Sequence, residues 1–462
     1  MFYGREKELK ELNDRYDDGR FECMIIYGRR RVGKTALINE FCRDKPTVFF
    51  SALRSSSSDN LEALSKAIYE KNDTDAVSAP VYRSFDDAFA EITRMGERER
   101  LVFVIDEYPY LAKAEKSVSS RLQHLIDRVW QNGKIFLILC GSSMSFMEKQ
   151  VLGRESPLYG RRTGQIKMQA MTYDEIAVFN PSLSCEQQAL IYGITGGIPH
   201  YINKLDVKKS VDEALKKNFF NRSAYLFEEP ENLLKQELRE PTLYNSIITA
   251  IAGGASKMSE ISTKCQIAGD VCAKYLKVLI GLGIVKKETP VTEKPGKKTI
   301  YRISDNFFTF WYRFVPPYLS AIESDRIDRI YDTAIKGELP NYMGLVFEQM
   351  CRTYLIKNDD KLPVLISNVG RWWGTDKKEK KEVEIDLVGV PVKGKEYLIC
   401  SCKYKNSAVG VDELEKLREY AAVFGKGSRY HYYIFSKGGF TEGLKAAAVR
   451  EEVTLVSLED MY

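Results

Sequence analysis

The chain has 462 residues and a net charge of +5, with 44% hydrophobic and 29% charged residues. These values are typical of a globular protein with two to four domains, and the absence of a long apolar run predicts no membrane partner. Nine scattered cysteines without a CxxC pair predict reduced thiols in a cytoplasmic protein. The mild charge does not by itself indicate nucleic-acid binding, so support for that function has to come from local clusters.

The segment FECMIIYGRRRVGKTALINEF, residues 21–41, is the most informative part of the chain. An apolar run predicts a buried strand, which leads into a loop with the spacing Gly-x-x-x-x-Gly-Lys-Thr and then into a helix. Such a loop turns its N–H groups toward an anion at the start of the helix. Lys34 is expected to reach the phosphates of ATP, and Thr35 to place its hydroxyl on Mg²⁺. The predicted cofactor-binding residues of the loop are Gly28, Arg29, Arg30, Arg31, Val32, Gly33, Lys34, Thr35 and Ala36.

Two later strands are expected to bring catalytic groups to the same place. LVFVIDEYPY, residues 101–110, is an apolar strand that ends in Asp106 and Glu107. Asp106 is expected to bind Mg²⁺ through a water molecule, and Glu107 is expected to polarise the attacking water. The strand KIFLILCGSS, residues 134–143, has a polar tip, where Ser142 is expected to sense the γ-phosphate or to orient that water.

Two further loops carry candidate groups. In LYGRRTGQI, residues 158–166, either Arg161 or Arg162 is expected to neutralise transition-state charge, within one chain or between two chains. TGGIPHY, residues 195–201, predicts a tight turn beside the nucleotide and places Pro199 among the cofactor-binding residues.

These motifs, with FYGREKEL at the start, follow one another as in the archaeal-type ATPase family, which the chain resembles over residues 1–240. This family is a branch of the AAA-like P-loop ATPases, related to origin-recognition ATPases and to signalling NTPases of the STAND group. The resemblance implies a sensor strand between the two Walker strands, a core over 1–205 and a helical lid over 206–241. It also implies that the segment 4–6 and Pro199 lie near the adenine.

Residues 242–305 predict a winged helix-turn-helix, because three helical patterns over 243–254, 256–267 and 268–285 precede two strands around a Pro-Gly turn. Across 286–302, six Lys or Arg face two Glu, which is consistent with phosphate contact; a protein-docking role is the alternative. In the third helix, Lys274 and Lys277 are the exposed base-reading candidates. The inward residues are expected to be Val271, Tyr275, Val278, Leu279 and Leu282. Linker helices are expected over 306–340.

Residues 341–462 predict an α/β domain that resembles the PD-(D/E)XK restriction-endonuclease fold, which is often appended in this family. The resemblance implies Glu348 as the helix acid, Asp386 as the main metal ligand and Lys403 as the residue that holds or deprotonates water. Ser401 stands where an acid is expected, and a hydroxyl is a poor Mg²⁺ ligand. Glu413, at the edge of the next helix's inward face, is one candidate replacement, and Glu384, which shares a strand face with Asp386, is another. An active and a degenerate site therefore both remain open.

The predicted fold class is therefore α/β: a P-loop NTPase core with a helical lid, a winged helix-turn-helix and a C-terminal restriction-endonuclease-like domain. The expected function is an ATP- and Mg²⁺-dependent ATPase that couples nucleotide state to DNA binding or processing. The alternative is an NTP-dependent switch or scaffold of the STAND type, whose degenerate nuclease domain only binds. The expected partners are DNA, through the winged helix and the C-terminal domain, and a second copy of the chain.

Overall fold

The computed structural model describes residues 2–72, 80–207, 209–238, 240–296, 298–324, 326–376, 379–425 and 427–462. The chain divides into two compact units. The first comprises Met1–Ala170 with Ile198–His200, and the second Met171–Gly197 with Tyr201–Tyr462. Across the described ranges, none of the helices combines the length and the apolar character that crossing a membrane requires.

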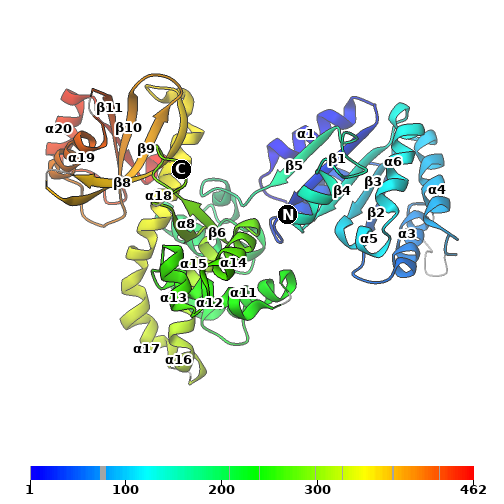
Figure 1. Ribbon diagram of the computed structural model, residues 1–462, viewed down its shortest axis with the longest axis horizontal. Coiled ribbons are helices and arrows are strands. Elements are labelled where there is room, and N and C mark those ends of the chain that lie inside the picture. Colours follow the sequence, from blue (N-terminus) through cyan, green and yellow to red (C-terminus); the bar gives the residue numbers. More distant parts are fainter. Residues whose placement is uncertain are drawn as a thin grey trace. The chain divides into compact units, whose positions relative to one another are not determined.

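The first unit is built on a sheet of five parallel strands in the order β2-β3-β4-β1-β5 (Figure 1). The strands are β1 (Glu22–Gly28), β2 (Thr47–Ser51), β3 (Val102–Asp106), β4 (Phe136–Gly141) and β5 (Gly164–Met168). Every residue of β1, β3 and β4 is buried, as expected for parallel strands covered on both faces. Because β4 lies between β1 and β3, the predicted sensor strand between the two Walker strands is confirmed.

Helices cover both faces of this sheet. They are α1 (Glu6–Asp17), α2 (Lys34–Cys42), α3 (Ser57–Asn72), α4 (Phe85–Arg98), α5 (Tyr108–Ala114) and α6 (Val118–Arg128). Helix α2 packs on one face, where the Phe41 ring lies 5.2 Å from that of Phe136. Residues Cys23, Ile25 and Tyr27 of β1 point to the other face and share a core with the buried side chains of α3 to α6. The sheet edge that carries the predicted motifs is thus held between two helical layers.

The second unit begins with helical segments. They are α8 (Cys185–Thr195), α10 (Val211–Phe219), α11 (Tyr225–Glu237), α15 (Asn306–Phe314) and α18 (Leu339–Lys357). The short helix α9 (Pro199–Ile202) is divided between the units, because its first two residues group with the first unit. The aromatic residues of α15 are buried, and the Tyr342 hydroxyl of α18 donates to the carbonyls of Gly193 and Asn306. This aromatic segment therefore forms core.

Three helices and a hairpin follow one another within the second unit, in the order that the sequence predicts. They are α12 (Pro241–Ala252), α13 (Met258–Lys264), α14 (Gly269–Gly281), β6 (Val285–Glu288) and β7 (Ile300–Ile303). The predicted inward face of α14 is correct at Leu279 and wrong at Val278, and the other three predicted residues, Val271, Tyr275 and Leu282, are half-buried. The structure buries Cys272, Leu276 and Leu279 and leaves Val278 38% exposed. Two apolar stripes lie side by side on this helix, and only packing against α12 and α13 selects one of them.

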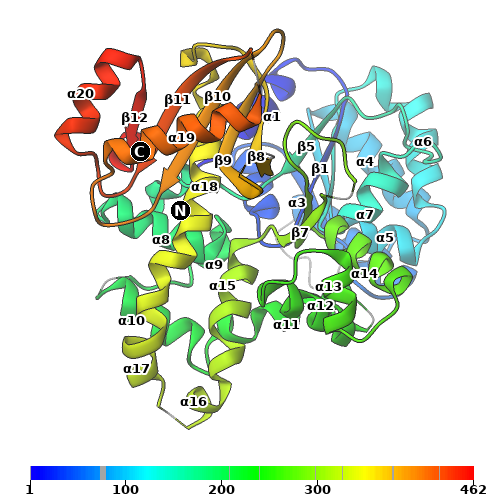
Figure 2. The same ribbon diagram turned by 60° about the vertical axis from the view of Figure 1, so that its left-hand side comes forward.

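A second sheet closes the chain, with the order β12-β11-β10-β9-β8 (Figure 2). Its elements are β8 (Ile366–Asp376), β9 (Lys381–Pro391), β10 (Glu396–Lys403), α19 (Val411–Phe424), β11 (Arg429–Ser436), α20 (Glu442–Glu451) and β12 (Thr454–Ser457). Strands β8, β9 and β10 pair antiparallel, whereas β10, β11 and β12 pair parallel. The apolar face of α19, with Leu414, Leu417 and Ala421, packs on this sheet as predicted.

Candidate nucleotide-binding site and a second acidic site

The loop between β1 and α2 is curled by three left-handed or unusual residues. Gly28 has φ +157°, Arg31 +71° and Gly33 +95°. A Cβ at Gly28 would lie 2.4 Å from the carbonyl oxygen of Met168, so only glycine fits between the loop and β5. A Cβ at Gly33 would meet no described atom within 4 Å. The space beside Gly33 is therefore open, which leaves room for a ligand at this end of the loop.

Lys34 and Thr35 begin α2 beside this space. The Lys34 ammonium donates to the carbonyl oxygens of Gly28 and Arg29, at 3.0 Å each, and burial lowers its pKa. The Thr35 hydroxyl donates to Oδ2 of Asp106 at 2.9 Å. The structure thus brings the predicted lysine, threonine and aspartate together at the carboxyl edge of the sheet, and this donor set of ammonium, hydroxyl and carboxylate fits a magnesium-bound polyphosphate.

Glu107 is held between two strand tips. It adopts φ +49°, and its N–H donates to Oδ1 of Asp106 at 2.9 Å. Its Oε2 accepts from the Ser142 hydroxyl at 2.9 Å and from the Ser142 N–H at 3.3 Å. Ser142 therefore controls where the Glu107 carboxylate points, a link that the two separate motifs did not reveal.

The N-terminal segment also contacts the loop. Arg5 adopts φ +68°, and its guanidinium donates to the carbonyl oxygen of Val32 at 3.3 Å and to that of Gln169. Within the loop, the Arg30 guanidinium donates to the Tyr110 hydroxyl at 2.7 Å. Pro199 belongs to the short segment 198–200 that groups with the first unit. Its predicted place beside the adenine stays a prediction.

Arg161 and Arg162 lie at the opposite edge of the same sheet. Strand β5 runs parallel to β1, with Gly164 beside Met24 and Met168 beside Gly28. The arginines precede β5, so at about 3.3 Å per residue they stand roughly 13 Å or more from the loop. The arrangement described does not bring them to the predicted site of their own chain, and their role in neutralising charge, within one chain or between two, stays a prediction.

Each of these arginines has a partner at that edge. The Arg161 guanidinium binds Asp127 of α6 with two hydrogen bonds of 3.0 and 2.9 Å, which hold the pKa of that carboxyl below its usual value. Arg162 donates to the Gln165 side chain at 2.9 Å. Both guanidinium groups therefore form hydrogen bonds with side chains at this edge of the sheet.

A second acidic site lies where β9, β10 and α19 meet. Oδ2 of Asp386 accepts from the Cys402 N–H at 2.7 Å and lies 3.5 Å from the Lys403 ammonium. Oε1 of Glu413 accepts from the Ser401 hydroxyl at 2.7 Å and lies 3.1 Å from the same ammonium. The structure therefore brings a second carboxylate to the position that Ser401 leaves without one. These two carboxylates raise the pKa of Lys403, against the effect of its burial.

Glu348, the predicted helix acid, is turned toward another partner. Its carboxylate lies 3.3 Å from Nε of Arg371 in β8, and Arg371 also pairs with Glu384 of β9 and, at 3.8 Å, with Glu288 of β6. Burial raises the pKa of Glu348 to about 7. Sequence analysis missed Arg371, because a single arginine in a tryptophan-rich strand forms no recognisable pattern.

The donor chemistry of the second site suits a hard cation, because two carboxylates are the ligands such ions prefer. Among the described residues, however, no cluster of three or more His, Cys, Asp or Glu side chains is placed to hold a metal ion. The Lys403 ammonium lies between the two carboxylates and neutralises part of their charge.

Comparison with known proteins decides the family. Residues 2–205 match a family described as an ATPase domain predominantly from Archaea, and residues 311–417 match archaeal and bacterial proteins of unknown function. The protein MJECL04 of Methanocaldococcus jannaschii is 34% identical over 447 residues, which cover 92% of this chain and 96% of that protein. The chain belongs to the archaeal-type P-loop ATPase family.

Two further similarities agree with this assignment. The ATP-binding protein MJ0423 of the same organism is 44% identical over 45 residues, 10% of this ATPase and 76% of that protein. The Walker-type ATPase paby2304 of Pyrococcus abyssi has a TM-score of 0.53 at 19% identity, over 68% of this chain and 96% of that chain. At this identity, the likeness to the Pyrococcus abyssi protein establishes the fold of the ATPase.

Proposed function

We propose that this ATPase binds ATP with Mg²⁺ in the loop 28–35, hydrolyses it, and couples its nucleotide state to DNA binding or processing. The observation that carries the proposal is the convergence of Lys34, Thr35 and Asp106 in front of an open, glycine-lined loop. Bound ATP and Mg²⁺ would supply the phosphoryl group and the cation that neutralises its charge.

The residues of the chain divide the remaining work. The loop N–H groups and the Lys34 ammonium bind the phosphates, and Lys34 exchanges its two carbonyl acceptors for phosphate oxygens as it does so. Thr35 and Asp106 hold the cation. Glu107 orients the attacking water and takes its proton, once the Ser142 hydroxyl presents it in the right direction.

Turnover of ATP tests this proposal. Lys34→Ala is expected to lower kcat/KM by about 100-fold or more, since it removes a cation that stabilises transition-state charge. Lys10→Ala, on the exposed side of α1, is the matched control and is expected to match the wild type. Equal turnover in the wild type and in Lys34→Ala, with or without DNA, would contradict the proposed ATP hydrolysis and favour the NTP-dependent switch or scaffold.

The coupling to DNA is supported by the basic character of the second unit's small module. Lys274 and Lys277 are exposed on α14, and the hairpin after it carries further cations; Lys297 of that hairpin lies outside the described residues. Such groups bind phosphates with a steep salt dependence. We expect a duplex to bind with an affinity that differs between the ATP and ADP states. Lys274→Glu with Lys277→Glu should weaken binding, and an unchanged affinity would exclude this surface.

A second candidate function is metal-dependent cleavage of nucleic acid at Asp386, Glu413 and Lys403. The specific observation in its favour is that Glu413 Oε1 lies 2.7 Å from the Ser401 hydroxyl, so that two carboxylates flank Lys403. Asp386 and Glu413 would hold the cation, and Lys403 would hold or deprotonate the water.

Cleavage of a duplex in Mn²⁺ or Mg²⁺ measures this activity. Asp386→Asn and Glu413→Gln are each expected to abolish it, whereas Glu415→Gln, exposed on the same helix, is expected to keep it. Cleavage that persists in Asp386→Asn would remove the proposal. A wild type that binds the duplex without cutting it would support the degenerate, binding-only alternative.

A further inference from the structure

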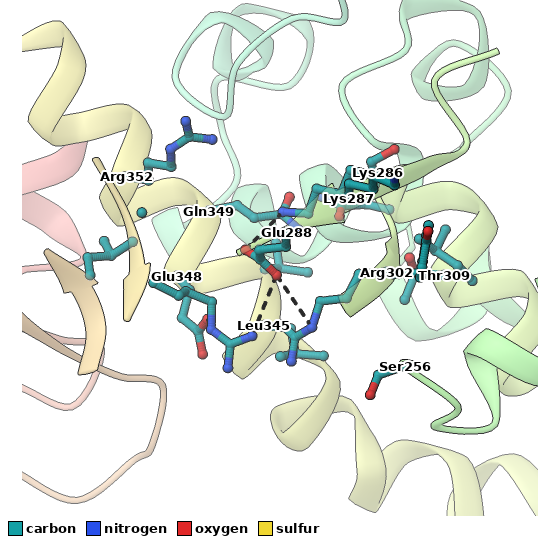
Figure 3. A pocket seen from close by; sticks show the side chains of 18 of the residues that line it. Ser256, Lys286, Lys287, Glu288, Arg302, Thr309, Leu345, Glu348, Gln349 and Arg352 are labelled. Carbon is teal, nitrogen blue, oxygen red and sulfur yellow. Dashed lines mark ion pairs between the residues drawn. The ribbon is translucent and has the colours of Figure 1, made fainter. Parts of the chain in front are cut away.

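A large cavity in the second unit is lined by an excess of positive charge. It has a volume of about 770 Å³ and lies between the hairpin β6–β7, helices α15 and α18, and strand β8. Six Lys or Arg and three Glu line it, together with neutral donors such as Ser256 and Thr309. Figure 3 shows Glu288 near the centre, with Lys286 and Arg302 of the hairpin beside it. A volume of this size is typical of a small-molecule site.

The positively charged side chains of the cavity outnumber the carboxylates that could neutralise them. Among the described residues, Glu288 is the one carboxylate within ion-pair distance of Lys286 and of Arg302, at 3.6 and 3.7 Å, which are longer than hydrogen bonds. Arg371 also lies 3.8 Å from Glu288, but it has two further acidic partners, Glu348 and Glu384. Within the described ranges, no carboxylate lies within ion-pair distance of Arg352, whose Nε donates to the Val369 carbonyl at 2.8 Å. Glu288 therefore has to neutralise both Lys286 and Arg302, and Arg352 adds a third cation without an acid beside it.

The electrostatic effect of this crowding is visible on Lys286. Burial lowers its pKa, and the charges of Arg352, Arg302 and Arg371 lower it further, against the attraction of Glu288. Burial and the charge of Arg371 likewise lower the pKa of Arg302. An anion that enters the cavity would replace this repulsion by charge-assisted hydrogen bonds.

The walls of the cavity are joined by the backbone. The Val291 N–H, in the loop after β6, donates to the Arg371 carbonyl of β8 at 2.9 Å. A Cβ at Gly370 would lie 3.2 Å from the Val291 side chain, so the hairpin loop packs closely on that strand. Apolar side chains, among them Ile251 and Leu345, line other parts of the cavity. The site thus offers a basic patch for phosphate and an apolar wall for an organic group.

We propose that this cavity binds a small organic phosphate of the nucleotide class, with its phosphate on Lys286, Arg302 and Arg352. This site is separate from the loop 28–35, and the proposal does not rest on ATP hydrolysis. The concave, many-sided shape favours a small molecule over a nucleic-acid backbone, which needs a continuous open groove.

Calorimetry with three probes tests the proposal: AMP, inorganic pyrophosphate and inorganic phosphate. The full chain is used both as wild type and as the Lys34→Ala variant, in which phosphate binding by the loop 28–35 is impaired. We expect saturable binding of AMP or pyrophosphate in both proteins, weakened at least 10-fold by Arg302→Gln. The matched control, Arg429→Gln, replaces an exposed arginine outside the cavity and is expected to bind as the wild type does.

Two further measurements separate a binding defect from a folding defect. Lys287→Gln, on the exposed part of the lining, should weaken binding without affecting the circular dichroism of the protein. Hydrogen exchange at the Val291 amide should slow when the probe binds. The proposal is overturned if no probe gives saturable heat in Lys34→Ala, if the cavity variants bind as the wild type does, or if only a short duplex binds.

Discussion

Glu348→Gln is expected to stabilise the protein at pH 8 and to have little effect at pH 5. The Glu348 side chain is 19% exposed, and burial raises its pKa from 4.5 to about 7. The charges of Asp386 and Glu288 raise this pKa further, and those of Arg371 and Arg302 lower it. Ionisation of the Glu348 carboxyl at high pH therefore lowers the free energy of unfolding.

The sign and size follow from proton linkage. Between pH 4.5 and 7 the folded protein binds more protons at Glu348 than the unfolded chain does, so stability falls as the pH rises through this window. At 1.36 kcal/mol per unit, the penalty reaches about 3 kcal/mol at pH 8 and stays below about 1 kcal/mol at pH 5. A glutamine cannot ionise, so the variant loses the penalty.

Urea unfolding at the two pH values, followed by tryptophan fluorescence, measures the difference. Three of the four tryptophans, Trp311, Trp372 and Trp373, lie in the second unit and report on its transition. Glu419→Gln, on the exposed side of α19, is the matched control and should change stability at neither pH. An equal effect of Glu348→Gln at pH 5 and pH 8, or a larger one at pH 5, would refute the reasoning.

Three further outcomes are expected. Gly28→Ala should lower the free energy of unfolding by about 2 kcal/mol, because the new Cβ meets the Met168 carbonyl. Gly33→Ala should lower it by only about 1 kcal/mol, through backbone strain. Thermal unfolding measures both variants, and a larger loss of stability in Gly33→Ala than in Gly28→Ala would contradict this reasoning. Arg161→Gln should change the free energy of unfolding by less than about 1 kcal/mol, since its ion pair is exposed. It should reduce ATP turnover only at protein concentrations that allow self-association. A loss of turnover that does not depend on dilution would place the residue in the site of its own chain. Ser142→Ala should lower kcat about 10-fold while calorimetry finds ATP affinity unchanged, and an equal loss of affinity would contradict its role in directing the carboxylate.

Much of the nucleotide site could be read from the sequence, because its geometry is local. The Gly-x-x-x-x-Gly-Lys-Thr spacing turns one loop by itself, and Asp106 directly follows an apolar strand. Parallel strands place their carboxyl ends at one edge of a sheet, so Thr35 and Asp106 meet without further information. The same rule, with the order β3-β4-β1, puts Ser142 between them and against Glu107.

Tertiary structure alone decided which residues meet across elements. The sequence left Glu413 at the edge of a helix face, and the packing of α19 on its sheet brings it to Ser401 and Lys403. The parallel pairing of β5 with β1 moved Arg161 to the far edge from the loop it was expected to serve. No spacing rule could have placed Arg371 against Glu288 and Glu348, because these contacts join segments whose separation in the chain carries no periodic signal.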